Sequence, residues 1–209
     1  MPSDFPFQEY ETVNARAAPL LAGQAELSRE FGAAWNAVAY RFQAVVEHGE
    51  SVSASLSKHG AGPPSEERYR QERDLYGFFA SGYSTLEAAF YGLHFVGAYL
   101  RPDLFQIKNK RQIGAPSGKL FTAAFPADQL GAVWAIILED PAYKTWGEIR
   151  NVLIHRTAPG RAIKFGGEDR WNLNDLEMTS SMPIQMRAEL ARMLSGLLSG
   201  ATRFAETRL

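Results

Sequence analysis

Apolar positions along most of this chain recur with the period of an α-helix. In the segment from residue 25 to 47 they fall three or four residues apart, a spacing that places them on one buried helical face. These positions are Leu27, Phe31, Ala34, Trp35, Val38, Phe42, Val45 and Val46. A shorter helix is expected before it, from about residue 9 to 21, with Pro19 as an interruption. The stretch 49–64 is rich in serine and glycine and ends in two prolines, so it is predicted to be a loop.

A second long helix is predicted over residues 66–100. Ser65 is a capping residue and the acids that follow it stabilise the first turn, while Pro102 stops the helix. Four glycines near its centre lower helix propensity but permit the close approach of a neighbouring backbone. They are Gly77, Gly82, Gly92 and Gly97. A kink or break is expected near residues 81–82.

The rest of the chain predicts three further helices and two long loops. The helices are expected over 127–138, 141–156 and 183–206. The loops cover about 101–126 and 157–181, and the second could hold a short hairpin around residues 166–167. The resulting prediction is an all-α fold, an antiparallel helical bundle built as a single domain over residues 1–209. About the first eight residues are the part that could be disordered.

Composition narrows the class of protein. With 209 residues, 45% of them hydrophobic, the chain is long enough for one sizeable core. Cysteine is absent, which excludes disulfides and thiolate metal ligands. The four histidines lack the spacing of a metal site, so no metal and no cofactor is expected. We find no signal peptide or membrane-spanning run and expect a cytoplasmic protein.

Charge is unevenly distributed along the chain. The formal net charge is −1, unlike that of a general nucleic-acid binder. Basic side chains nevertheless gather in residues 101–126 and 150–170. In the first of these regions, Lys108, Lys110 and Arg111 could follow a phosphate backbone, although such a run is also typical of a solvated loop.

The densest group of functional side chains lies near the end of the helix predicted over 141–156. Glu148, Asn151 and His155 fall at i, i+3 and i+7 and form one polar stripe. On a regular helix, Arg150 projects about 140° away from His155. The two can therefore act on one ligand only if the helix ends between them or a second chain supplies one of them. An arginine fork holds phosphate oxygens and a histidine titrates near neutral pH, so the pair suits metal-free phosphodiester cleavage.

The segment Arg150-Asn151-x-x-x-His155 resembles the R-x4-H signature of HEPN (higher eukaryotes and prokaryotes nucleotide-binding) domains. These are small α-helical bundles, often dimeric. Many are metal-independent endoribonucleases of toxin–antitoxin, CRISPR and abortive-infection systems, and others only bind. The resemblance implies a HEPN-like homodimer that binds RNA and could cleave it. In that role Arg150 orients the scissile phosphate, Asn151 supports the site, and His155 performs acid–base chemistry.

A polar seam runs along the helix predicted over 66–100. Its members are Tyr83, Glu87, Tyr91 and His94. A buried carboxylate needs a cationic partner, and Glu87 could pair with Arg150 or Arg41 and so fix the arginine's orientation. Tyr83, Glu87 and Glu148 are therefore expected to support the site. The seam could equally be a satisfied polar layer between helices or lie at a dimer interface.

Further RNA contacts are expected from basic side chains in the two loops and at the helix end that precedes the second loop. They are Arg156, Arg161, Lys108, Lys110 and Arg111. The alternative function is a non-catalytic helical bundle that binds a nucleotide or a protein partner. In that interpretation, His155 and Arg156 are ordinary basic residues at a helix end, where they complement the macrodipole.

Overall fold

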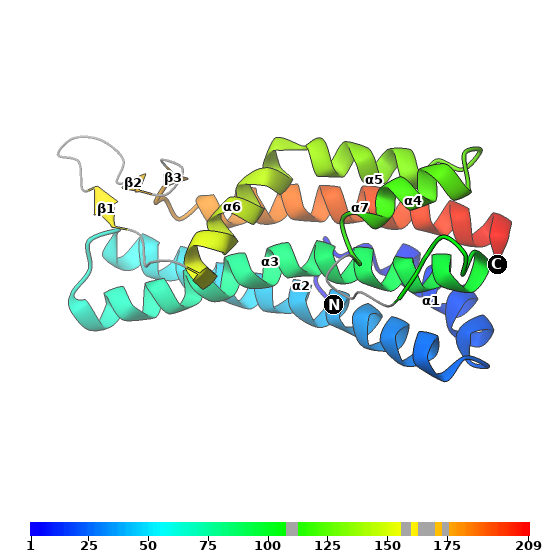
Figure 1. Cartoon of the computed structure of the whole chain (residues 1–209). Coiled ribbons are helices and arrows are strands. Elements are labelled where there is room, and N and C mark those ends of the chain that lie inside the picture. Colours follow the sequence, from blue (N-terminus) through cyan, green and yellow to red (C-terminus); the bar gives the residue numbers. More distant parts are fainter. Residues whose placement is uncertain (108–112, 156–159, 163–169, 173–175) are drawn as a thin grey trace. The chain divides into compact units, whose positions relative to one another are not determined.

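The computed structural model describes residues 1–107, 113–155, 160–162, 170–172 and 176–209. Within these residues the protein is all-α, with seven helices and one small three-stranded sheet (Figure 1). The predicted fold class, a helical bundle, is confirmed.

The helices are α1 (Phe7–Leu21), α2 (Ala25–His59), α3 (Ser65–Leu100), α4 (Ser117–Ala124), α5 (Leu130–Glu139), α6 (Pro141–His155) and α7 (Met182–Arg208). The strands are β1 (Arg161–Ala162), β2 (Arg170–Trp171) and β3 (Leu176–Glu177). β1 pairs with β2 and β2 with β3, both antiparallel.

The chain forms two compact units. Unit 1 comprises Met1–Tyr40, Ser84–Asp140 and Ala191–Leu209, and unit 2 comprises Arg41–Tyr83 and Pro141–Leu190. Helices α2, α3 and α7 contribute residues to both units. The R-x4-H segment therefore belongs to unit 2.

Helix α2 extends to His59, so the prediction of a loop over 49–64 is wrong for most of its length. Val52 and Leu56, one turn apart, are buried and continue the apolar face of the helix. Serine hydroxyls on this part of α2 hydrogen-bond to side chains of α3. Gly60, with a φ of 65°, follows the helix in the left-handed conformation typical of a helix end.

Helix α4 lies inside the segment 101–126, for which the sequence predicts a loop. Its anchor is Phe121, whose ring centroid lies 5.5 Å from that of Trp134 in α5 and 5.4 Å from that of Phe204 in α7. An isolated helix of this length is unstable in water, because few hydrogen bonds offset the cost of nucleation. Burial of Phe121 in unit 1 therefore decides that this segment is helical.

The N-terminal helix also differs from its prediction. Pro19 lies inside α1, and the helix ends only at Leu21. Ala17 and Leu21 are buried on either side of the proline, and their burial offsets the one backbone hydrogen bond that proline removes. Before the helix, Phe5 is buried and its ring contacts that of Tyr10 at a centroid distance of 5.4 Å, so this part of the chain packs onto α1.

The sheet follows α6 in the chain and is anchored by an indole ring. β2 coincides with the second arm of the predicted hairpin and β1 overlaps the start of the first, whereas residues 163–169, with the predicted turn, lie outside the described residues. β3 was not predicted, because a two-residue strand carries no periodic signal. Trp171 is fully buried, and its ring stacks on Phe79 of α3 at a centroid distance of 5.8 Å.

The four central glycines of α3 make room for rings. The sequence predicts the close approach of a neighbouring backbone at these positions, but the neighbour at each is an aromatic or imidazole ring. The pairs are Gly77 with His48, Gly82 with Trp146, Gly92 with Trp35 and Gly97 with Phe105. The glycines do not break the helix, since α3 is continuous from Ser65 to Leu100.

His94 is a buried histidine in unit 1. Its Nδ1 lies 2.8 Å from the Ser117 hydroxyl oxygen, and its ring meets those of Phe95 and Phe105 edge-on. Burial lowers the pKa of His94 below its ordinary value of 6.5, and a hydrogen bond to the backbone of Gln106 opposes this shift only in part. The folded state therefore favours the neutral imidazole.

Stability is consequently expected to depend on the protonation of His94. On acidification, the histidine of the unfolded chain binds a proton at a higher pH than the buried one does. The contribution of His94 to the free energy of unfolding is therefore fully present above about pH 6.5. It falls as the pH decreases toward the folded-state pKa, by at most about 1.4 kcal/mol per pH unit. The measurement is urea denaturation of wild type and His94→Asn at about pH 7 and about pH 5. The variant should be less stable at the higher pH and lose less on acidification. Equal losses in the two proteins would contradict this role.

Candidate functional site

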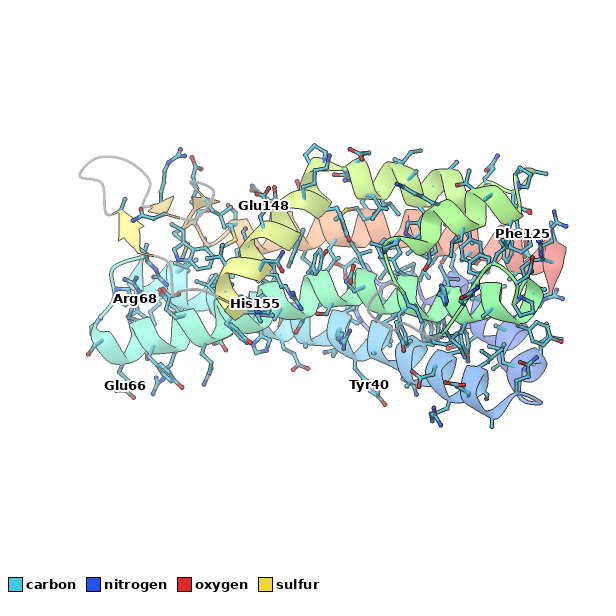
Figure 2. The ribbon with its side chains drawn as sticks, in the orientation of Figure 1. Tyr40, Glu66, Arg68, Phe125, Glu148 and His155 are labelled. Carbon is cyan, nitrogen blue, oxygen red and sulfur yellow. The ribbon has the colours of Figure 1, made fainter. Side chains whose placement is uncertain are left out.

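The R-x4-H segment occupies the last turns of α6. This helix continues through Arg150 and ends at His155, so it does not end between the two. Glu148, Asn151 and His155 are all exposed, as expected of the predicted polar stripe. His155 lies at the C-terminal end of α6 in Figure 2. The imidazole is therefore open to solvent.

The Arg150 guanidinium is turned toward this stripe. Its Nη1 donates a hydrogen bond of 2.9 Å to the side-chain oxygen of Asn151. Around the helix axis, Asn151 lies between Arg150 and His155. The Cζ of Arg150 also lies 5.8 Å from the centroid of the Tyr83 ring, a cation–π distance. Asn151 and Tyr83 together hold the guanidinium at the surface of α6.

Tyr83 connects this arginine to the N-terminal half of α6. Its hydroxyl lies 3.1 Å from that of Tyr143, and the two rings are 5.3 Å apart. Gly147 of α6 passes closely over Tyr83, because a Cβ at this position would lie 2.9 Å from the Tyr83 Cε2. Tyr83 thus contacts Arg150 from a fixed position, and its supporting role in the site stays a prediction.

The other members of the polar seam belong to unit 1. Glu87 points toward Gly114, with its Oε2 3.7 Å from the position of a Cβ there. Tyr91 donates a hydrogen bond of 2.8 Å to Glu30. Burial is the main cause that raises the pKa of Tyr91 to about 12, and the hydrogen bond to the Glu30 carboxylate is the second. For Tyr91, the arrangement is that of a satisfied polar layer.

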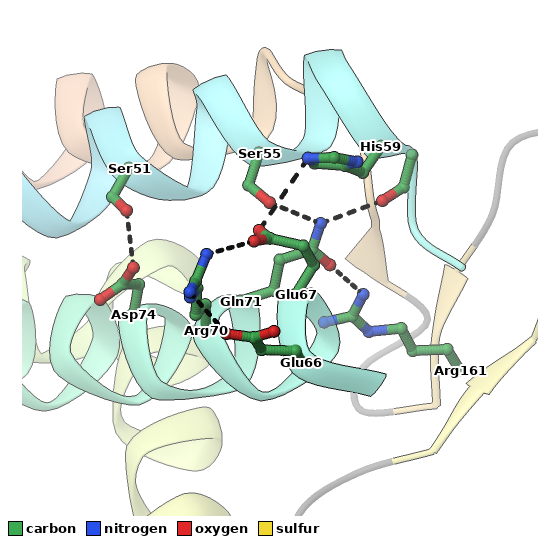
Figure 3. Close-up of polar contacts among 10 residues, drawn as sticks. Ser51, Ser55, His59, Glu66, Glu67, Arg70, Gln71, Asp74 and Arg161 are labelled. Atoms are coloured by element: carbon green, nitrogen blue, oxygen red, sulfur yellow. Dashed lines mark hydrogen bonds and ion pairs between the residues drawn. The ribbon is translucent and has the colours of Figure 1, made fainter. Parts of the chain in front are cut away.

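Arg161 is enclosed, which contradicts the prediction that it contacts RNA. Its side chain is 0% exposed. Its Nε and Nη2 lie 3.1 and 2.9 Å from the Glu72 Oε1, and its Nη1 donates to the Ala61 carbonyl at 2.8 Å. The same Nη1 donates to the Gln71 amide oxygen (Figure 3). A guanidinium without exposed surface does not reach a backbone phosphate. Arg161 instead attaches β1 to α3 and to the turn before α3.

The enclosed arginine ends a polar layer between α2 and α3, drawn in Figure 3. Gln71 is buried and donates hydrogen bonds of 3.0 Å to the Ser55 hydroxyl and to the Gly60 carbonyl. One turn along, the Ser51 hydroxyl donates a 2.6 Å hydrogen bond to Asp74. These bonds satisfy the polar groups that the serine-rich half of α2 brings into the interior of unit 2.

His48 and Asp74 meet in the same layer, but their contacts are structural. The His48 Nδ1 lies 3.3 Å from the Asp74 carboxylate, which Arg73 also binds with two hydrogen bonds of 3.1 Å. Burial acts to raise the pKa of Asp74, yet hydrogen bonds from Arg73, Ser51 and His48 hold it below its ordinary value. The other ring nitrogen of His48 faces Gly77 of α3. These contacts join α2 to α3 within unit 2.

The importance of the Arg161 contacts is testable. Arg161→Met should lower the free energy of unfolding by about 1–3 kcal/mol, because it leaves Gln71 and the Ala61 carbonyl without their donor. The loss stays below that of a fully buried ion pair, since Glu72 is partly exposed and keeps Arg68 at 3.0 Å. Arg70→Met removes an arginine of α3 whose side chain is 51% exposed and serves as the control, with a change within about 0.5 kcal/mol. Urea denaturation measures both, and an equal effect of the two variants would contradict the prediction.

The remaining predicted RNA contacts, Lys108, Lys110, Arg111 and Arg156, lie outside the described residues. A pocket of about 530 Å³ opens at the other end of α6, between this helix, α7 and the strands β2 and β3. Thr145, Arg170 and Gln185 are among its lining residues. The R-x4-H side chains do not line this pocket, which the sequence did not predict because distant segments form it.

Comparison of the chain with models of protein families, with curated proteins and with solved structures found no match. Among the described residues, no three histidine or acidic side chains gather in a way that could hold a metal ion. None of the helices, as far as the structure describes them, is long and apolar enough to cross a membrane.

Proposed function

We propose that this chain is a HEPN-like RNA-binding protein that cleaves RNA without a metal ion. The observation that carries the proposal is the hydrogen bond of 2.9 Å from Arg150 to Asn151, which turns the guanidinium toward the exposed stripe that ends at His155. The Nε of Arg150 is buried, so Nη2 and the second N–H of Nη1 are the groups that can hold two oxygens of a phosphate. An exposed imidazole one turn beyond Asn151 is then available for proton transfer.

The chemistry requires only the groups at this site. The RNA 2′-oxygen attacks the adjacent phosphorus and forms a cyclic phosphate, while the bond from phosphorus to the 5′-oxygen breaks. One imidazole accepts the proton of the 2′-hydroxyl, and an imidazolium donates a proton to the departing 5′-oxygen. Arg150 stabilises the negative charge that increases on the non-bridging oxygens. The products end in a 2′,3′-cyclic phosphate and a 5′-hydroxyl.

A homodimer is part of the proposal because one chain offers one imidazole at this place. Helix α6 is continuous between Arg150 and His155, whose side chains leave the helix about 140° apart. Two copies that meet at the C-terminal ends of α6 would bring both imidazoles and both guanidinium groups to one phosphate. One His155 then acts as the base and the other as the acid.

The test is to incubate the purified protein with end-labelled RNA in excess EDTA. We expect fragments that carry a 2′,3′-cyclic phosphate. DNA of the same sequence is the control and should stay intact, because it lacks the attacking hydroxyl. RNA that is bound but left intact would overturn the catalytic proposal and favour a non-catalytic binding protein.

A further inference from the structure

Three tyrosines lie along one face of α3 in unit 2. Tyr69, Tyr76 and Tyr83, here called the tyrosine row, are seven residues apart and therefore follow one side of the helix at intervals of about 10 Å. Tyr69 is 68% exposed and Tyr76 is 46% exposed. Tyr83 is half-buried where Arg150 covers its ring. The exposed part of the row thus leads to the arginine of the proposed site.

An arginine stands between the first two tyrosines. Arg73 is four residues after Tyr69 and three before Tyr76, so it shares their face, and its side chain is 57% exposed. Its Nε and Nη2 bind the buried carboxylate of Asp74. These two bonds fix the plane of the guanidinium and do not involve Nη1. The row therefore alternates flat rings with a positively charged group of fixed orientation.

The composition of this face favours RNA over a second protein chain. Among the described residues of α3 in unit 2, the large exposed hydrophobic side chains are Tyr69 and Tyr76, while aliphatic ones such as Leu75 are buried. The fully buried core of a protein–protein interface is more apolar than the rest of the surface. Isolated aromatic rings beside guanidinium groups are instead what proteins use to stack unpaired bases and bind the phosphates between them.

We infer that the tyrosine row and Arg73 form a binding platform for single-stranded RNA. Bases stack on Tyr69 and Tyr76, Arg73 binds a phosphate between them, and the strand continues to Arg150. The inference rests on the proposed function, because it extends the path of the RNA away from the R-x4-H segment. A duplex does not use the platform, since its bases already stack on one another.

The test is fluorescence anisotropy with a labelled oligouridine, carried out in a His155→Ala background so that the RNA is not cut. Replacing Tyr69 and Tyr76 together by alanine should weaken binding about tenfold or more. Replacing both by phenylalanine keeps the rings and should leave the affinity within about twofold. Tyr40→Ala is the matched control, because this tyrosine of α2 is 76% exposed and lies in unit 1. It should not change binding, and an RNA duplex should bind equally well with and without the row.

The possible results distinguish failure of the platform from failure of the proposed function. If the double alanine variant binds oligouridine as tightly as its parent while the wild type cleaves RNA, the platform is wrong and the proposed function stands. If neither the parent nor the wild type binds RNA, both proposals fail. If the double alanine variant changes only the mass measured by light scattering, the row is a protein interface and the inference is overturned. Thermal unfolding midpoints equal to that of the parent should accompany the expected result, because both replaced rings are exposed.

Discussion

His155→Ala should lower the rate of metal-free RNA cleavage by about 100- to 10,000-fold while leaving RNA affinity within about threefold. The side chain is exposed at the end of α6, so its removal deletes proton transfer and leaves the packing of the helix unchanged. Single-turnover cleavage in EDTA gives the rate, and anisotropy gives the affinity. The two readouts separate an acid–base role from a binding role.

Arg150→Ala should affect both measurements, because the guanidinium is proposed to hold the phosphate before and during the reaction. Arg150→Lys keeps the charge but loses the planar fork, and its rate should lie between those of wild type and alanine variant. A lysine that fully replaces Arg150 would contradict the proposal that two phosphate oxygens are held together.

The control for these variants is His59→Ala. This histidine also belongs to unit 2, is partly exposed and is the last residue of α2. Its Nε2 lies 4.0 Å from the Oε2 of Glu67. The His59→Ala variant should cleave RNA at the wild-type rate. If His155→Ala and His59→Ala are both as active as wild type, the activity comes from another site or another protein, and the R-x4-H segment is not catalytic.

Gly82→Ala should lower the free energy of unfolding by about 1–3 kcal/mol. A Cβ at this position would lie 2.5 Å from Cη2 and 2.8 Å from Cε3 of the Trp146 ring. Trp146 is fully buried against Phe78 and Phe79, at centroid distances of 5.0 and 5.1 Å, so the ring has no free space into which to move. Urea denaturation measures the loss.

Gly196→Ala is the matched control for this prediction. Gly196 lies inside α7, and nothing would lie within 4 Å of a Cβ there. In this position alanine should stabilise the protein by about 0.5–1 kcal/mol through its higher helix propensity. The same substitution is therefore expected to have opposite signs at the two sites, and equal effects would contradict the steric argument.

A second substitution tests whether the contact with Trp146 is the cause. Trp146→Phe removes the part of the indole nearest Gly82, and it also removes an N–H that has no acceptor among the described residues. In the Gly82→Ala background it should recover part of the lost stability. If the two losses simply add, the overlap of Cβ and ring is not what destabilises Gly82→Ala.

Much of the candidate site could be predicted because it is local. Arg150, Asn151 and His155 lie within two turns of one helix, so the helical period alone predicts that Asn151 and His155 share an exposed stripe. The contact of Arg150 with Tyr83 could not be read in the same way, because it joins residues far apart in the sequence. The surroundings of Arg161 could not be predicted for the same reason. Its charge predicts an RNA contact, whereas Glu72 and Gln71 enclose it.

The sequence by itself determined which long segments are helical, because amphipathic periodicity reports a buried face whatever that face contacts. It did not determine that the serine-rich end of α2 is helical or that α4 exists. Tertiary structure decided both, since the hydroxyl groups of α2 find partners on α3, and Phe121 of α4 finds rings on α5 and α7. The physical reason is that local sequence sets helix propensity and periodicity, whereas the burial of a polar or aromatic group is stabilising only when a distant segment supplies its partner.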